Sequence, residues 1–302
     1  MTLDADVIVV GAGPAGLSAA LILGRACRRV LVFDDGRPRN DATEALHGFL
    51  TRDGIPPSEF RRLAREEVAR YDGVRLESAT VETASRLDAG AFMVGLRDGR
   101  AFTARKLLLA TGVRDNLPHV PGLDELYGHS VFHCPYCDGW ELRDEPVAVY
   151  GSGKRAFGLS LELTGWTKDI VICSDGSCQL DTADVAMLER NGIAVREQPV
   201  ARLEGHKGRL QRVVFADGSD LPRRALFFTT GQTASSDLAR ALGCEFNDKG
   251  TVRTGTYEAT DIPGLYVAGD ASRAVQWVIV AAAEGAEAAY AINQELIKEQ
   301  WR

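Results

Sequence analysis

The strongest structural signal in the chain is the segment Ala5-Asp-Val-Ile-Val-Val-Gly-Ala-Gly-Pro-Ala-Gly16. Its apolar run at 5–10 predicts a buried parallel strand, and the apolar residues 17–24 predict a helix. Between them lies a G-x-G-x-x-G turn, whose glycines allow a tight turn, backbone approach to a pyrophosphate, and close packing of helix on strand. A second strand, 30–33, ends at an acid suited to ribose hydroxyls. The predicted dinucleotide site comprises Gly11, Gly13, Pro14, Ala15, Gly16 and Asp34.

The same plan recurs later in the chain. A strand at 147–150 leads into Gly151-Ser-Gly-Lys-Arg-Ala156, followed by a helix, a strand at 170–173 and Asp175. Each half then carries a hairpin signal, at Asp98-Gly99 and at Asp217-Gly218, before a strand that ends in Thr-Gly. This duplication predicts two Rossmann-like domains, each with an inserted β-hairpin or small sheet.

A further strand signal near the C-terminus ends in Gly269-Asp270 and precedes an Ala-rich helix at about 281–298. This half-unit most naturally completes the first domain. The fold class is therefore α/β, with the second Rossmann-like domain nested in the first. We expect the outer domain to comprise residues 1–116 and 245–302, and the inner domain to comprise residues 117–244.

Composition narrows the class of protein. The 302 residues are 45% apolar and 25% charged, which supports a folded core. Lys and Arg number 35 and Asp and Glu 42, so 35 − 42 gives a net charge of −7, unlike the basic surplus typical of nucleic-acid binders. No apolar run approaches the ~18 residues of a spanning helix. The acidic N-terminus also lacks the features of a signal peptide, so we expect a cytoplasmic protein without membrane or nucleic-acid partners.

Cys134 and Cys137 form a Cys-x-x-Cys, which near a βαβ pattern in a cytosolic protein indicates redox chemistry. His133 is placed to stabilise a Cys134 thiolate and to lower its pKa, or else it is an ordinary packed histidine. A zinc site formed by these three residues and His129 is an alternative, although four ligands within nine residues are cramped for a tetrahedral ion. We therefore predict a redox pair and no metal.

The motifs together resemble those of low-molecular-weight thioredoxin reductases. The segments 11–16, 109–112, Cys134-Pro-Tyr-Cys-Asp-Gly139, 151–156 and 266–270 occur in that family's order and span nearly the whole chain. The resemblance implies FAD in the outer domain, a pyridine nucleotide in the inner one, and a homodimer. It also implies that Cys137 faces the flavin, that Cys134 exchanges with substrate and that Asp138 is the acid/base. Asp138 as a simple turn residue stays open.

The resemblance extends to the flavin site, where Asp270 would hold the ribitol chain. The loop after it would cover the flavin, although Trp277 is nearly as well explained as a core residue. The further flavin-site residues implied are Asn40, Ala110, Thr111, Gly112, Gly269, Gln276, Trp277 and Val278. Arg37-Pro-Arg-Asn40, His47-Gly-Phe-Leu50 and His133 are similar to the branch of gliotoxin-type dithiol oxidases and their bacterial relatives, which form disulfides in small molecules.

The inner domain departs from the NADPH-dependent pattern. Where that pattern has His-Arg-Arg, this chain has Ser174-Asp175-Gly176. An aspartate there repels a 2′-phosphate and suits a 2′-hydroxyl, so NADPH is disfavoured, and both NADH and no nucleotide at all stay open. Lys154 and Arg155 keep NADPH from being excluded. The predicted inner site comprises Gly151, Gly153 and Asp175.

The sequence thus predicts a flavin-dependent thiol–disulfide oxidoreductase that moves two electrons between FAD and a dithiol or disulfide through Cys134–Cys137. As a reductase it would act on a thioredoxin-like protein or a small disulfide, with a nucleotide or ferredoxin as donor. As a dithiol oxidase it would use oxygen as acceptor and no nucleotide. A non-enzymatic sensor that binds FAD and NAD is the alternative from another class.

Overall fold

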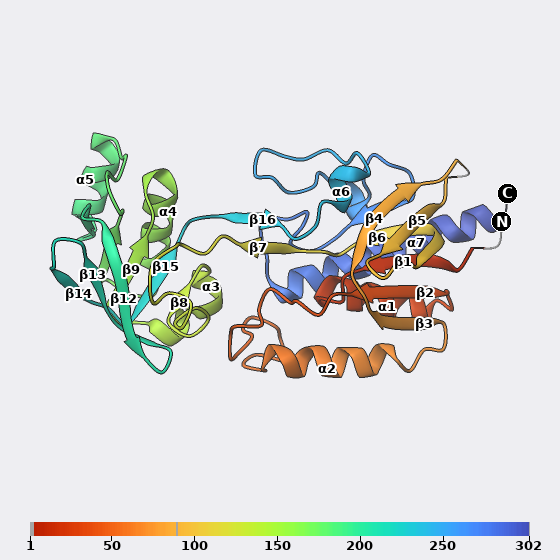
Figure 1. Cartoon of the computed structure of the whole chain (residues 1–302), viewed down its shortest axis with the longest axis horizontal. Helices are drawn as coiled ribbons and strands as arrows, with labels where there is room; N and C mark the ends of the chain where they lie inside the picture. The colour runs from red at the N-terminus through yellow and green to blue at the C-terminus, as the bar shows by residue number, and fades with distance from the viewer. Residues whose placement is uncertain (1–2, 89, 302) are drawn as a thin grey trace. The chain divides into compact units, whose positions relative to one another are not determined.

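The computed structural model describes residues 3–88 and 90–301 (Figure 1). The chain divides into two compact units. The first comprises residues 1–41, 48–114 and 232–302, and the second comprises 42–47 and 115–231. Each has a parallel sheet with helices, which confirms the predicted α/β class.

The first unit is built on a sheet whose parallel part follows the predicted Rossmann pattern. Strand β1 pairs with β2 on one side and with β6 on the other, and β3 extends the sheet beyond β2. The C-terminal strand β17 pairs with the end of β6, so the two ends of the chain share one sheet. These parallel strands are β1 (Ala5–Val10), β2 (Val30–Asp34), β3 (Val74–Ser78), β6 (Ala101–Leu109) and β17 (Leu265–Val267).

The hairpin predicted at Asp98-Gly99 is present. Strand β5 (Phe92–Leu96) runs antiparallel to the first half of β6, and β4 (Val81–Arg86) pairs with β5. Strand β6 therefore serves two purposes, because its first half closes the hairpin and its second half lies between β1 and β17.

Helices of the first unit cover this sheet, and an apolar core lies between them. The two that pack together are α1 (Pro14–Arg25) and α7 (Val278–Gln300), while α2 (Pro57–Val68) lies beside α1. Within residues 3–88 and 90–301, no helix combines the length and the apolar character that crossing a bilayer needs.

The approach of α7 to α1 is close enough to require glycine. A Cβ built on Gly285 would lie 1.9 Å from the carbonyl oxygen of Ala15. We expect Gly285→Ala to destabilise the protein by about 1–3 kcal/mol, because the two helix backbones must separate. The matched control is Gly158→Ala in a helix of the second unit, where a Cβ meets nothing within 4 Å. Thermal unfolding of both variants checks this, and an unchanged melting temperature for Gly285→Ala would contradict the close contact.

The second unit repeats the plan with a smaller sheet. Its five strands are parallel, in the order β11 (Ala194–Arg196), β10 (Ile170–Cys173), β9 (Val147–Tyr150), β15 (Ala225–Phe228) and β8 (Val131–Phe132). The insertion is a three-stranded antiparallel sheet of β12 (Val200–His206), β13 (Arg209–Phe215) and β14 (Asp220–Pro222). Its helices are α3 (Pro135–Asp138), η1 (Trp140–Leu142), α4 (Gly153–Leu163) and α5 (Thr182–Arg190).

The boundaries of the compact units differ from the predicted domain boundaries. The chain crosses between the units at the paired strands β7 (Val113–Asp115) and β16 (Gln232–Ala234), so residues 232–244 belong to the first unit. The physical reason is burial: Leu238 and Ala239 of α6 (Leu238–Ala241) and Cys244 pack in the core that contains the β4–β5 hairpin. Residues 42–47 belong to the second unit, because Ala42 packs directly against Gly128.

Candidate redox site and cofactor cradle

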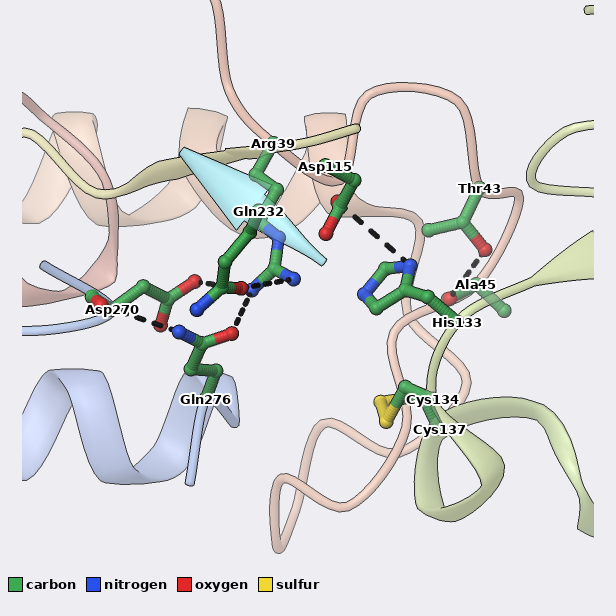
Figure 2. The surroundings of a disulfide bond; sticks show 10 residues. All are labelled: Arg39, Thr43, Ala45, Asp115, His133, Cys134, Cys137, Gln232, Asp270 and Gln276. Atoms are coloured by element: carbon green, nitrogen blue, oxygen red, sulfur yellow. Dashed lines mark hydrogen bonds and ion pairs between the residues drawn. A yellow bond between two sulfur atoms is a disulfide. The ribbon is translucent and has the colours of Figure 1, made fainter. Parts of the chain in front are cut away.

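Cys134 and Cys137 form a disulfide at the start of α3, with their Cα atoms 5.3 Å apart (Figure 2). Pro135 is the first helical residue, where its missing N–H costs nothing and its fixed φ suits the helix. Gly139 follows the last helical residue. This position requires glycine, because a Cβ there would lie 2.5 Å from the Pro135 carbonyl and 2.9 Å from the Trp166 ring. Proline and glycine thus fix the loop that brings the two sulfurs together. The zinc alternative needs both thiolates, and in this structure both sulfurs are in the disulfide.

Asp138 directly follows Cys137 in the sequence. Burial raises its pKa to about 7, and the charge of Glu141, one helical turn further on, adds to this rise. Glu141 in turn lies 3.6 Å from the Nε2 atom of His47. A carboxyl group with a pKa near neutrality can both accept and donate a proton under ordinary conditions. This property is what the predicted acid/base role of Asp138 requires.

His133 faces Asp115 (Figure 2), with 3.8 Å between its Nδ1 atom and the carboxylate, and its ring lies 6.0 Å from that of Phe228. Asp115 also accepts a hydrogen bond from the Tyr127 hydroxyl. These contacts orient the imidazole of His133, and its action on the Cys134 thiolate stays a prediction.

Aromatic side chains surround the disulfide segment of the second unit. Tyr136, between the two cysteines, is 60% exposed and contacts the ring of Trp166 edge-on at 5.3 Å. Trp140 is 64% exposed and carries the guanidinium of Arg143 at 4.3 Å from its ring. Exposed aromatic faces beside a redox disulfide offer apolar contact area to a substrate.

The glycine-rich turn of the first unit fits a dinucleotide. A Cβ on Gly11 would lie 2.3 Å from the Ala110 carbonyl, and one on Gly16 would lie 1.9 Å from the Gly11 carbonyl, so neither position accepts a side chain. Gly13 has open space around it, and helix α1 starts directly after it at Pro14 without a side-chain cap or an acid in its first turn. The uncapped N–H groups at such a helix N-terminus can bind a phosphate.

Asp34 is tied to this turn. Its carboxylate accepts a hydrogen bond from the Ala12 N–H at 3.0 Å and pairs with Arg65 of α2. The predicted residues after β6 also lie here: the Ala110 N–H donates to the Val10 carbonyl at 2.8 Å, and Gly112 has a left-handed φ of 66°. The structure thus brings the predicted residues from two glycine-containing turns together at the carboxyl ends of β1 and β6.

Asp270 follows β17 and lies in a polar cluster (Figure 2). The Nη1 atom of Arg39 donates to the Asp270 carboxylate at 2.8 Å and to the Gln276 amide oxygen at 2.7 Å. Trp277 precedes α7 and is 38% exposed, which contradicts the core alternative for this residue. Asn40 accepts a hydrogen bond from Arg61 at 3.2 Å, and its predicted flavin contact stays a prediction.

The glycine-rich turn of the second unit is arranged differently. The Gly153 N–H donates to the Cys178 carbonyl at 2.7 Å, so this N–H group is occupied by the loop after β10. Asp175 uses both carboxylate oxygens, since one accepts from the Tyr150 hydroxyl at 2.8 Å and the other from the Val200 N–H at 2.7 Å. Lys154 pairs with Asp181 and Asp184 of the following segment.

Comparison with known proteins identifies a family that matches the redox disulfide and the glycine-rich turns described above. The family model for pyridine nucleotide-disulphide oxidoreductases matches residues 5–285. The chain therefore belongs to this family, among its thioredoxin reductase-like flavin-dependent disulfide oxidoreductases. This confirms the resemblance found from the motifs, and membership implies FAD.

Individual relatives are similar over most of their length. Thioredoxin reductase tcpT of Claviceps purpurea is 34% identical over 278 residues, which cover 88% of this chain and 86% of the relative. The crystal structure of a putative thioredoxin reductase from Bacillus anthracis superposes with a TM-score of 0.93 at 34% identity, covering 98% of this chain and 99% of that chain. The crystal structure of HlmI gives 0.94 at 36% identity, covering 98% and 93%.

Sequence reasoning missed several charged residues around these sites. Arg39 was noted only as part of the segment 37–40, and Glu141 was not noted. Glu258 and Glu284, which are buried acids of the first unit, were also missed. One signal was available: Glu284 is a charged residue on the Ala-rich face of a helix that packs on the core.

Proposed function

We propose that this protein oxidises dithiols to disulfides, with oxygen as the final acceptor and without a nucleotide as hydride donor. The observation that carries the proposal is the second unit's glycine-rich turn, whose Gly153 N–H is occupied by the Cys178 carbonyl. Within residues 3–88 and 90–301, the corresponding Gly13 N–H of the first unit donates to no backbone carbonyl. A pyrophosphate needs free N–H groups at such a turn.

Electrostatics at the second unit's turn supports the same direction. Both oxygens of Asp175 already accept one hydrogen bond each from the second unit itself, so only their remaining lone pairs are left for a ribose hydroxyl. Lys154, one of the two cations that keep NADPH from being excluded, pairs with two carboxylates. A 2′-phosphate at Asp175 would therefore meet a carboxylate, and the charge of Lys154 is already balanced.

In the proposed reaction, the Cys134–Cys137 disulfide takes two electrons from the substrate by thiol–disulfide exchange. A substrate thiolate attacks the Cys134 sulfur, a mixed disulfide forms, and the Cys137 thiolate leaves. The second substrate thiol gives its proton to Asp138 and attacks the mixed disulfide, which releases a substrate disulfide and the Cys134 thiolate. The substrate has then lost two electrons, and the Cys134–Cys137 pair has gained them.

When bound, FAD supplies the acceptor that takes the two electrons from this pair and passes them to oxygen, giving hydrogen peroxide. The residues that would hold it are those of the turn at 11–16 with Asp34, residues 110–112, and Asp270 with Gln276, Trp277 and Val278. The first unit offers the turn, the uncapped start of α1 and the carboxylates for this purpose.

An anaerobic absorbance titration of the purified protein tests the direction. Dithiothreitol, NADH and NADPH are added to separate samples and the bleaching of the flavin is followed. We expect bleaching by dithiothreitol within mixing time, return of the colour on admitting air, and peroxide equal to the dithiol consumed. Fast bleaching by either nucleotide would overturn the proposal.

A nucleotide-dependent reductase is the second candidate, favoured by the names of the curated relatives, which are thioredoxin reductases. In that case NADH would bleach the flavin, and a thioredoxin-like disulfide would restore the colour without air. A non-enzymatic sensor would show no turnover with either substrate.

We also infer that the partners are a second copy of this chain, as a homodimer, and a dithiol substrate, either small or on a thioredoxin-like protein. The exposed rings of Tyr136 and Trp140 favour an apolar surface next to the reacting sulfurs. A single species of twice the chain mass in light scattering supports the homodimer, and a monomer would refute it. The cytoplasmic location stays a prediction.

A further inference from the structure

Two buried carboxylates share one arginine in the first unit. Glu258 is fully buried and accepts hydrogen bonds from Thr254 at 3.1 Å and from Arg273. Glu284 is 6% exposed, and 2.8 Å separates its Oε1 atom from the Nε atom of Arg273. A carboxylate buried without a cation is costly, so Arg273 holds two elements that would otherwise repel each other.

The turn that carries Glu258 is strained. Tyr257 has a φ of 56° and Glu258 a φ of 61°, both in the left-handed region that non-glycine residues seldom adopt. Such a conformation persists only where surrounding contacts determine it. Here it places the Glu258 carboxylate against the guanidinium of Arg273, on the loop after β17.

The same cluster reaches the Gly269–Asp270 turn. The second oxygen of Glu284 accepts from the Gly269 N–H at 2.8 Å, and Gly269 has a left-handed φ of 80°. Gly285, the next residue along α7, packs against the backbone of Ala15 in the glycine-rich turn's helix. Helix α7 therefore contacts the Asp270 turn through Glu284 and helix α1 of the dinucleotide site through Gly285.

We propose that Glu258, Arg273 and Glu284 are positioning residues that hold the Gly269–Asp270 turn in the conformation that binds the flavin. The inference rests on the FAD that the family implies and on Asp270 as a contact of it. It does not depend on the direction of electron flow, so its failure and that of the proposed function are distinguishable.

Protonation of Glu284 provides a specific readout. Burial raises the pKa of Glu284 to about 7, against the opposing hydrogen bond from Gly269. Among the described residues, the charged groups facing it are Glu258 from the turn before β17 and Arg273 from the loop after it. Above this pH Glu284 is ionised and pairs with Arg273, so we expect FAD to bind more tightly at pH 8 than at pH 6.

The test measures FAD release from the holoprotein by flavin fluorescence after dilution, between pH 6 and 8. We expect Arg273→Met to raise the Kd for FAD about tenfold, because it removes the half-exposed cation that neutralises two buried carboxylates, and we expect partial rescue in Arg273→Lys. Glu284→Gln keeps an acceptor for the Gly269 N–H but cannot ionise, so its Kd should be independent of pH. The matched control is Arg253→Met, which removes an exposed pair with Glu245 in the same unit.

Either of two results overturns the proposal. One is a Kd in Glu284→Gln that follows pH as in the wild type. The other is a Kd in Arg273→Met within about twofold of the control, since that difference is well below 1 kcal/mol. A purely structural role predicts a lower melting temperature of the apoprotein with unchanged Kd. If Arg273→Met does not fold, Glu284→Gln decides alone.

Discussion

Replacing Cys134 with serine is expected to lower the rate of dithiol oxidation by about a thousandfold or more, as when one member of a catalytic set that acts as a unit is removed. The reason is that the Cys134–Cys137 disulfide is where substrate sulfur enters, and a lone Cys137 thiol cannot exchange with a dithiol. Peroxide production with dithiothreitol measures the loss. FAD content should be unchanged, because the disulfide lies in the second unit and the predicted flavin residues lie in the first.

The matched control is Cys27→Ser, which removes an exposed free thiol of the first unit. It should oxidise dithiothreitol at the wild-type rate. Retention of even a tenth of the activity in Cys134→Ser, with normal FAD content, would show that dithiols reach the flavin without the disulfide. That outcome would refute the role assigned to Cys134.

Asp138→Asn is expected to slow turnover about a hundredfold, the scale of general acid–base catalysis by a positioned side chain. The pKa of Asp138 is raised to about 7 by burial and by Glu141, so below pH 7 the carboxyl is protonated and cannot accept the substrate proton. Activity should therefore rise with pH through about 7 in the wild type and lose this step in the variant. Initial rates of dithiol oxidation between pH 5.5 and 8.5 measure this.

Glu141→Gln provides the internal check. It removes the negative charge that raises the pKa of Asp138, so the rise in activity should shift to lower pH. Glu145→Gln, another acid of this segment, exposed and paired with Arg224, is the control and should leave the profile unchanged. An unshifted profile in both Asp138→Asn and Glu141→Gln would assign the pH dependence to another group.

The ionisation of Asp138 should lower the stability of the fold as pH rises, whereas it raises the activity. The folded-state pKa of Asp138 lies above its ordinary value of 3.8, so its ionisation costs stability as pH rises from about 4 to about 7. Asp138→Asn should therefore melt at a higher temperature than the wild type at neutral pH. A lower melting temperature would mean that the ionised carboxylate is stabilised by its surroundings.

Much of the fold was predictable because short, local sequence patterns specify its strands, turns and helices. Apolar runs ending in glycine turns predicted β1, β9 and the helices after them, and the duplication of this pattern placed the C-terminal strand β17 in the first sheet. The predicted boundary at 244 differs from that of the compact units, because residues 232–244 carry no strong local signal. Their place is decided by burial of Leu238 and Ala239 against a core formed by distant strands.

The sequence alone determined the family, the two glycine-rich turns and the Cys134–Cys137 pair, because each is a short pattern whose chemistry follows from residue type and spacing. The hydrogen bonds and ion pairs that these patterns make depend on the folded chain. The turns at Gly13 and Gly153 look alike in sequence, yet among the described residues the Gly153 N–H bonds to a carbonyl 25 residues further on and the Gly13 N–H bonds to no backbone carbonyl. Arg273 likewise lies between Glu258 and Glu284 only in the folded chain. Hydrogen bonds and buried charges join residues that the fold brings together, and no local periodicity records those pairings.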